Sequence, residues 1–380
     1  MPWGILTGVR PTKIVRRYLE DGLTTEQIKQ LLHQKYHISP EKIELILEVA
    51  LKEQQVLKTN TNNELSIYIG IPFCPSKCIY CSFTSFSVQQ KAPKIDAYLR
   101  ALAVEIKSMQ KSINKYKIRT IYIGGGTPTS LNDAQLEFLL DSINTTFDVS
   151  KIDEYTVEAG RPETITLNKL KIMKKYNVSR ISINPQSMVQ STLDLIGRTH
   201  SVDDVYTAFL NAQAVGFDNI NMDIIVGLPE ENIQHIQYTL DCMDKLSPTN
   251  ITVHTLAIKT ASTLKYDQEK YNLAQSNIIK DMLEYTQDYM KCHEFKPYYL
   301  YRQKNILGNF ENVGYTKEGY SCIYNIQIIE EVQTILAMGA GGASKFISNN
   351  ILQRFINVKG VEEYIARIDE MIEKKKLLLE

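Results

Sequence analysis

The sequence predicts an α/β protein built on a parallel sheet, and two observations lead to this fold class. After residue 63, short runs of β-branched and apolar residues alternate with longer stretches of helical periodicity, six times in succession. The runs are almost continuously apolar, which is typical of strands buried on both faces. Strand followed by helix favours right-handed crossovers between parallel strands. A doubly wound sheet and a partial barrel share this pattern, and periodicity alone does not separate them.

Residues 1–63 are expected to form a helical segment ahead of the sheet. Thr24 and Gln27 have the spacing of a capping box, which marks the beginning of a helix. Ser39 and Pro40 are placed as N-cap and first helical position of a further helix. A run of threonine and asparagine residues closes the segment and is expected to be a linker or turn.

The sheet and the helices around it are expected in residues 64–262. The predicted strands are 66–71, 120–123, 154–158, 179–183, 219–226 and 250–256. Helical patterns fill the gaps between them, for example 94–110, 132–143 and 231–246. From about residue 264 the alternation stops, and a long helical pattern, an aromatic region, a glycine-rich stretch and a charged helix follow. The sequence therefore predicts three parts, 1–63, 64–262 and 263–380.

Composition is that of an ordinary globular protein. Of 380 residues, 43% are hydrophobic and 23% are charged, which excludes disordered and collagen-like chains. Because 43 basic residues balance 43 acidic ones, we expect no nucleic-acid partner. No apolar run approaches the roughly 18 residues of a membrane span. The beginning of the chain lacks the basic region of a signal peptide, so we expect a cytoplasmic protein.

A cysteine triplet is the strongest chemical signal in the chain. Cys74, Cys78 and Cys81 lie directly after the first predicted strand, on a loop at its carboxyl end. The scattered cysteines are Cys242, Cys292 and Cys322. Three thiolates can hold three irons of a [4Fe–4S] cluster and leave the fourth iron open. Structural zinc would need four ligands in paired spacing, and no second pair lies nearby, so the spacing favours an iron–sulfur cluster.

Glycines and polar residues follow the later strands. The glycines 124–126 come after the second strand; alone they are typical of a turn, but beside the cysteine loop they favour a backbone that approaches a ligand. Polar candidates near the later strand ends are Glu158, Gln186, Arg198 and Asp223. A single such residue is often only a solvated loop residue. Asp223 is the stronger candidate because burying a carboxylate within an apolar strand is costly without a partner. In a barrel these ends converge on one face.

The segment I-P-F-C-P-S-K-C-I-Y-C resembles the radical S-adenosylmethionine (SAM) enzymes. In that family the open iron binds the amino and carboxylate groups of SAM, and an electron from the cluster cleaves SAM to a 5′-deoxyadenosyl radical. The G-G-G-T-P element is similar to the one whose backbone holds the amino group of SAM. The resemblance implies a [4Fe–4S] cluster on the three cysteines and SAM as the second cofactor.

The whole chain resembles, more narrowly, the oxygen-independent coproporphyrinogen III dehydrogenase family, and its beginning and its segment 300–315 look like the HemZ-type branch. The resemblance implies a partial (β/α)6 TIM-like barrel, with an N-terminal helical segment and a C-terminal helical or wing domain that covers the substrate. The implied catalytic residues are Tyr68, Glu158 and Asp223. The implied SAM contacts are Tyr68, Tyr80, Gly125, Gly126, Thr127, Glu158, Gln186, Arg198, Asp223 and Ala257.

The function implied by this resemblance is anaerobic oxidative decarboxylation of coproporphyrinogen III to protoporphyrinogen IX in haem biosynthesis. Two positions depart from the decarboxylating members. Gly70 replaces a histidine, and Ser82 and Phe83 follow Cys81 where those members carry a further cysteine. The branch also has an additional N-terminal region, which we expect to be missing here. A haem-binding chaperone of the same family, or a radical SAM methyltransferase or haem-modifying enzyme, therefore remain alternatives.

A tetrapyrrole substrate would bind through anionic propionates, which need cationic partners. The candidates are Arg161, Arg302 and Lys304. His254, within a strand, is expected to be a packed core histidine. Packing is also the simpler interpretation of three tyrosines that could stack on a macrocycle, which are Tyr298, Tyr299 and Tyr301. The resemblance implies a low-potential electron donor such as flavodoxin or ferredoxin as a partner.

Overall fold

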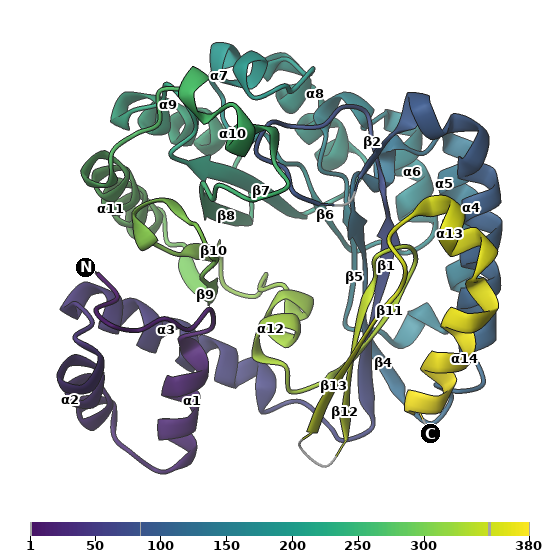
Figure 1. The fold of residues 1–380 in the computed structure, drawn as a ribbon, viewed down its shortest axis with the longest axis horizontal. Helices are drawn as coiled ribbons and strands as arrows, with labels where there is room; N and C mark the ends of the chain where they lie inside the picture. Colours follow the sequence, from purple (N-terminus) through teal and green to yellow (C-terminus); the bar gives the residue numbers. More distant parts are fainter. Residues whose placement is uncertain (1, 84, 349–350, 380) are drawn as a thin grey trace.

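A curved sheet of eleven strands, in the order β13-β12-β11-β1-β4-β5-β6-β7-β8-β10-β9, is the centre of the fold (Figure 1). The computed structural model describes residues 2–83, 85–348 and 351–379. Six neighbouring strands pair in parallel and form an open barrel. These strands are β1 (Glu64–Ile71), β4 (Lys117–Gly125), β5 (Glu154–Glu158), β6 (Arg180–Ser182), β7 (Asn219–Val226) and β8 (Asn250–Thr255). All six were predicted from the sequence, and β5 and β7 have the predicted bounds.

Helices cover the outer face of the barrel. They are α4 (Val88–Met109), α5 (Asp133–Thr146), α6 (Leu167–Lys175), α8 (Val202–Ala214), α9 (Ile233–Asp244) and α11 (Ser276–Cys292). Two short helices, α7 (Gln190–Leu195) and α10 (Thr263–Tyr266), pack instead against the loop that contains Ile79. Several begin at capping boxes, for example Asn132 with Gln135 and Ser201 with Asp204. Each main crossover helix buries one apolar stripe against the sheet, as the helical periodicity predicted.

The N-terminal helices lie beside one edge of the barrel, as Figure 1 shows. They are α1 (Thr12–Glu20), α2 (Thr25–Tyr36) and α3 (Pro40–Leu57). The predicted capping box of Thr24 and Gln27 is present. Trp3 donates from Nε1 to Glu311 at 2.7 Å, which ties the beginning of the chain to the edge of the sheet. The N-terminal segment is therefore docked onto the barrel through buried polar contacts as well as apolar packing.

The last third of the chain extends both edges of the same sheet. On one edge β10 (Asn312–Thr316) pairs antiparallel with β8, and β9 (Lys296–Tyr301) pairs with β10. On the other edge β11 (Thr334–Met338) pairs parallel with β1 and carries β12 (Ala343–Ser348) and β13 (Ile351–Ile356). These five strands were not predicted from the sequence. The proposed division into 1–63, 64–262 and 263–380 stays a prediction, and the sheet is continuous across residue 262.

Helix α12 (Ile323–Glu330) crosses the barrel at the amino ends of its strands. Glu154, the first residue of β5, accepts a hydrogen bond from the backbone N–H of Ile323 at 2.7 Å. A carboxylate at a helix N-terminus satisfies unpaired N–H groups and interacts favourably with the helix dipole. The contact fixes α12 beneath the barrel and leaves the opposite end, where the strands finish, for ligands.

Two C-terminal helices, α13 (Val361–Ala366) and α14 (Ile368–Leu379), pack along α4 (Figure 1). A fully buried ion pair joins Lys375 of α14 to Glu105 of α4. Lys375 also donates to the carbonyl of Ala337 at 2.6 Å, and Glu105 accepts from the backbone N–H of Gly339 at 2.8 Å. The pair therefore connects the end of the chain to β11, the neighbour of β1. No helix in the described ranges is long and apolar enough to cross a membrane.

Replacing Lys375 by methionine is expected to lower the free energy of unfolding by about 3–5 kcal/mol, because it leaves the buried Glu105 carboxylate without its cation. Urea unfolding followed by circular dichroism measures the change. Lys374→Met is the matched control, since Lys374 is exposed and its one ion pair among the described residues is with Glu370. The control should change stability by less than about 1 kcal/mol. Equal effects of the two substitutions would contradict the prediction.

Candidate active site at the carboxyl ends of the strands

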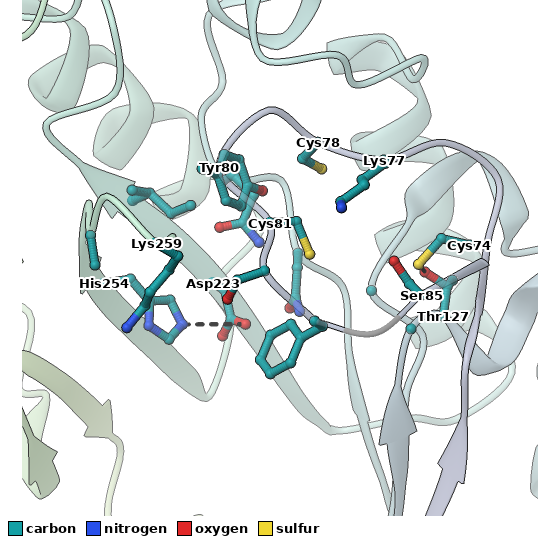
Figure 2. Close-up of a pocket in the computed structure, with 18 of the residues that line it drawn as sticks. Cys74, Lys77, Cys78, Tyr80, Cys81, Ser85, Thr127, Asp223, His254 and Lys259 are labelled. Atoms are coloured by element: carbon teal, nitrogen blue, oxygen red, sulfur yellow. Dashed lines mark hydrogen bonds and ion pairs between the residues drawn. The ribbon is translucent and has the colours of Figure 1, made fainter. Parts of the chain in front are cut away.

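A cavity of about 250 Å³ opens at the carboxyl ends of the parallel strands. Its walls come from the loop after β1, the glycine element after β4, the ends of β5, β7 and β8, and the loop after β9. In a barrel of parallel strands this is the face where active sites lie. Figure 2 shows the side chains from these elements directed toward one another around the cavity.

Cys74, Cys78 and Cys81 all line this cavity. The loop that carries them is closed by a short parallel pair, β2 (Phe73–Cys74) with β3 (Phe86–Ser87). A turn from Cys78 to Cys81 has an N–H···O distance of 3.1 Å, and Ser76 donates to the carbonyl of Gly197 at 3.0 Å. Among the residues that the structure describes, the thiols are not drawn together into a closed group of metal ligands. They surround one space that all three can face.

Two arginines give the cysteine loop a positive environment. Arg161 donates from Nη2 to Sγ of Cys78 at 3.1 Å, and Arg198 lies close by. Burial alone would raise the pKa of the Cys78 thiol, but the two guanidinium groups outweigh it and hold this pKa below its usual value. Thiolates and an anionic cluster need such cationic surroundings, so the donor set fits an iron–sulfur cluster.

The glycine element lies directly against the cysteine loop. Gly125 has a positive φ of 110°, and a Cβ on Gly126 would lie 2.5 Å from the carbonyl oxygen of Phe73. No larger residue fits this close approach of two backbones. The hydroxyl of Thr127 lies 3.5 Å from Sγ of Cys74. The two motifs that the sequence singled out separately are therefore neighbours in space.

Glu158 and Asp223 supply two buried carboxylates with different protonation behaviour. Burial raises the pKa of Glu158 to about 7, although it accepts hydrogen bonds from the Tyr122 hydroxyl at 2.8 Å and the Gly125 N–H at 3.3 Å. Burial also acts on Asp223, but His254 and Asn221 outweigh it and lower its pKa. Nε2 of His254 lies 3.6 Å from Oδ2 of Asp223 (Figure 2). At neutral pH Asp223 is ionised, and Glu158 is close to its midpoint.

Gln186 has a backbone conformation that points to a binding role. Its φ is 71°, in the left-handed region that non-glycine residues rarely adopt, and its backbone bonds to the carbonyl of Asp223 and the N–H of Ile225 hold it there. Within the described part of the chain, the side-chain oxygens of Gln186 and Asn184 are buried without a hydrogen-bond partner. Both residues line the cavity. Buried polar atoms of this kind call for a ligand that satisfies them.

The remaining residues predicted to contact SAM are distributed around the same space. Nine of the ten line the cavity: Tyr80, Gly125, Gly126, Thr127, Glu158, Gln186, Arg198, Asp223 and Ala257. The tenth, Tyr68, lies beneath the glycine element, with its hydroxyl 3.3 Å from a Cβ built on Gly125. Its ring stacks near those of Tyr122 and Tyr324. The fold therefore brings the whole predicted set together, and the individual roles stay predictions.

The cations suggested for substrate binding are placed differently from the prediction. Arg161 lines the cavity but bonds to the cysteine loop. Arg302 is not among the residues that line the cavity: it donates to the carbonyl of Leu6 at 2.6 Å and to Oδ1 of Asn309 at 2.6 Å, and its guanidinium stacks on Trp3. Its role toward a propionate stays a prediction that these contacts do not support. Lys304 is exposed and does not line the cavity.

Sequence reasoning missed other residues that do line the cavity. Lys259 lies just past the end of β8, two positions after Ala257, and Lys77 lies between two of the cysteines. The position after the sixth strand was a usable signal for Lys259. His254 and Tyr301, for which the sequence favoured packing in the core, also line the cavity, and the Tyr301 hydroxyl lies 3.3 Å from Nδ1 of His254. Tyr298 and Tyr299 are packed in the interior, as the simpler interpretation held.

Comparison with known proteins agrees with this geometry. Residues 68–243 match the radical SAM superfamily. The whole chain is 43% identical to the oxygen-independent coproporphyrinogen-III oxidase-like protein HemZ of Bacillus subtilis, over 77% of that protein. It is 32% identical to the heme chaperone HemW of the same organism, over 80% of this chain and 76% of that protein.

The fold is shared with a solved structure, coproporphyrinogen III oxidase (HemN) from Escherichia coli, described as a radical SAM enzyme. The TM-score is 0.67 at 22% identity, and the match covers 85% of this chain and 73% of that chain. The predicted partial barrel of the radical SAM type is confirmed. The family carries a [4Fe–4S] cluster and SAM, the two cofactors that the cysteine loop and the glycine element predicted. The chain belongs to the radical SAM superfamily and, within it, to the oxygen-independent coproporphyrinogen-III oxidase-like family.

Proposed function

We propose that this radical SAM enzyme converts propionate groups of coproporphyrinogen III to vinyl groups under anaerobic conditions, giving protoporphyrinogen IX in haem biosynthesis. The single observation that carries the proposal is one cavity that collects three cysteines and nine predicted SAM contacts and also holds Lys259, whose Nζ atom has no partner among the described residues. The similarity to HemZ supports the substrate class. Each conversion removes one hydrogen atom, one carbon dioxide molecule and one electron from the propionate.

Cys74, Cys78 and Cys81 would hold the cluster, and its open iron would face the cavity. Bound together, the cluster and SAM supply a carbon-centred radical that can remove a hydrogen atom from an unactivated carbon. The chain's own task is to exclude water and to orient the reactants. The cysteine loop forms one side of the cavity and the glycine element forms another. Thr127 of the glycine element contacts the cysteine loop at Phe73 and Cys74.

SAM carries an ammonium group, a sulfonium group and a carboxylate, and the cavity has matching charges. The carboxylate of Glu158, beside the Gly125 N–H, would accept from the ammonium group. Arg198 lines the cavity and would bind the carboxylate of SAM, and its donation to the carbonyl of Asn184 would orient it. Gln186 and Asp223 line the side of the cavity nearer β7 and would contact the nucleoside.

Lys259 is the best candidate for a propionate partner. It lines the cavity, and burial lowers the pKa of its ammonium group, so an incoming carboxylate would relieve the cost of that burial. In the described ranges no hydrogen bond or ion pair occupies its Nζ atom. We infer that Lys259, with Lys77 at the outer edge, takes the role that the sequence assigned to Arg302 and Lys304. A low-potential donor such as flavodoxin or ferredoxin in the cytoplasm would supply the electrons.

A haem chaperone is the second candidate, because HemW proteins are among the relatives. The observation that weighs against it is the state of His254, the histidine in the cavity. Both of its ring nitrogens have partners, Asp223 on one side and Tyr301 on the other. Haem iron needs a free imidazole nitrogen, so His254 would have to break one of these contacts.

Each of the three loop cysteines is expected to be required for the cluster. Cys74→Ala, Cys78→Ala or Cys81→Ala should remove most of the iron bound after anaerobic reconstitution, because a cubane with only two thiolate anchors is poorly held. Iron and sulfide analysis measures the loss. Cys292→Ala is the control, since Cys292 is exposed on α11 and remote in sequence from the loop. Full cluster loading in Cys78→Ala would refute the assignment.

SAM affinity is expected to depend on pH through Glu158. Its pKa is about 7 in the free protein, so lowering the pH through 7 protonates the carboxylate and removes its attraction for the ammonium group. About one unit below the pKa only about a tenth of the carboxylate is ionised, so affinity should fall roughly tenfold. Asp223 stays ionised over this range because its pKa is lowered.

Equilibrium binding of SAM to the cluster-loaded protein between about pH 6 and pH 8 checks this expectation. Glu158→Gln should bind SAM more weakly and lose the pH dependence. The same pH profile in both proteins would show that Glu158 does not contact the ammonium group.

Lys259→Met is expected to raise KM for coproporphyrinogen III about tenfold to a hundredfold, which corresponds to roughly 1.5–3 kcal/mol for a lost charged contact. Carbon dioxide release and mass spectrometry of the tetrapyrrole, both in the presence of SAM and reductant, give the measurement. Lys265→Met is the control because Lys265 is exposed on α10 and outside the cavity.

The same assay separates the enzyme from the chaperone. Carbon dioxide release that requires SAM supports the decarboxylase. If the protein cleaves SAM and binds haem while coproporphyrinogen III stays intact, the proposed reaction is wrong.

A further inference from the structure

We propose that Arg161 is a positioning residue that tunes the cluster, because its guanidinium donates a charged hydrogen bond to the Cys78 ligand and so makes the cluster easier to reduce. This inference rests on the cluster of the proposed function and not on the identity of the tetrapyrrole. It replaces the substrate-binding role that the sequence suggested for Arg161.

The contacts of Arg161 are directed at the cysteine loop. Its Nη2 atom lies 3.1 Å from Sγ of Cys78 and 2.8 Å from the carbonyl oxygen of Ser76. The side chain is only 3% exposed, and Cys78 is 5% exposed. One nitrogen thus connects a cluster ligand to the backbone two residues before it. A guanidinium has donors but no acceptor, so it can bond to a thiolate without competing for iron.

A second layer of residues holds the guanidinium in this position. Nη1 of Arg161 lies 3.6 Å from Oε1 of Glu163, which also accepts from the Thr199 hydroxyl at 3.0 Å. Nδ1 of His200 lies 3.3 Å from the other oxygen of Glu163. Glu163 therefore forms an ion pair with Nη1 of Arg161, while Nη2 contacts the sulfur. An arginine aimed at an anionic substrate would not need a carboxylate fixed behind it and a thiol in front.

The effect on the cluster follows from electrostatics. Reduction adds one electron from a one-electron donor to the cluster; no bond forms or breaks, and the donor is oxidised by one electron. The added negative charge spreads onto the sulfur atoms, where a nearby cationic donor stabilises it. Hydrogen bonds to sulfur and net charge are known determinants of cluster potentials. Burial strengthens the effect because the local dielectric constant is low. Arg161 should raise the potential, and the carboxylate of Glu163 should lower it.

The test is a redox titration of the reconstituted full-length protein with dithionite, followed by electron paramagnetic resonance, without SAM or tetrapyrrole. Arg161→Met should make reduction at least tenfold less favourable, which is a shift of about 59 mV to more negative potential for one electron. Arg161→Lys keeps the charge but not the fork, so its shift should be smaller. Arg367→Met is the control, because Arg367 lies on the exposed surface of the C-terminal helices and should leave the potential unchanged.

Glu163→Gln provides the opposite sign. Removing this negative charge should move the potential in the positive direction, a result that a merely structural role of the loop would not produce. Glu163→Gln also tests the proposal if Arg161→Met fails to take up iron. An unchanged potential in Arg161→Met with full iron content would overturn the proposal, as would a negative shift in Glu163→Gln. If the unaltered protein releases no carbon dioxide from coproporphyrinogen III while these potential shifts are present, the result counts instead against the proposed function.

Discussion

The parallel register between β1 and β4 is the constraint on which the site depends. It pairs Gly70 with Gly124 and Ile71 with Gly125, so the two strands end at the same level of the sheet. The cysteine loop and the glycine element then have to pass one another closely, and the missing side chain at Gly126 makes this possible. Because a parallel strand returns through a crossover, the later parallel strands of the barrel, β5 to β8, also end on this face. Glu158 and the loops beyond it are brought to the cysteines by the same geometry.

The last third of the chain stabilises the pairing of β1 with β4 from outside the barrel. Strand β11 pairs with β1 on the side opposite β4, so the strand that leads into the cysteine loop is bonded on both sides. The buried pair of Lys375 and Glu105 then connects β11 to α4 and α14. At the other edge, Arg302 uses its donors to hold the N-terminal segment. Charged residues that do not line the cavity therefore stabilise the sheet around it, and a buried charge of this kind is costly when its partner is removed.

Charges inside the cavity are divided by position. The two arginines lie at the cysteine loop, where thiolates and an anionic cluster would need them, and the carboxylates lie at the end of β5 and within β7. Lys259 stands apart, at the end of β8, where a further anion can enter. This division is consistent with three ligands of different charge in one space. The proposed roles follow this division: Arg161 acts on the cluster, and Lys259 binds the substrate.

The sequence by itself determined the six parallel strands and the two cofactor motifs, because these depend on neighbouring residues. A strand buried on both faces must be apolar throughout, and three thiols on one cubane must lie within a single loop. Tertiary structure alone decided which cations face the cavity. Arg302 and Lys259 look alike in a sequence, but the partners of Arg302 are carbonyls almost three hundred positions away. The five added strands also escaped prediction, since their pairing depends on which edge remains open after the barrel has formed. The sequence shows the type of each side chain, whereas the function of that side chain depends on the residues that the fold brings into contact with it.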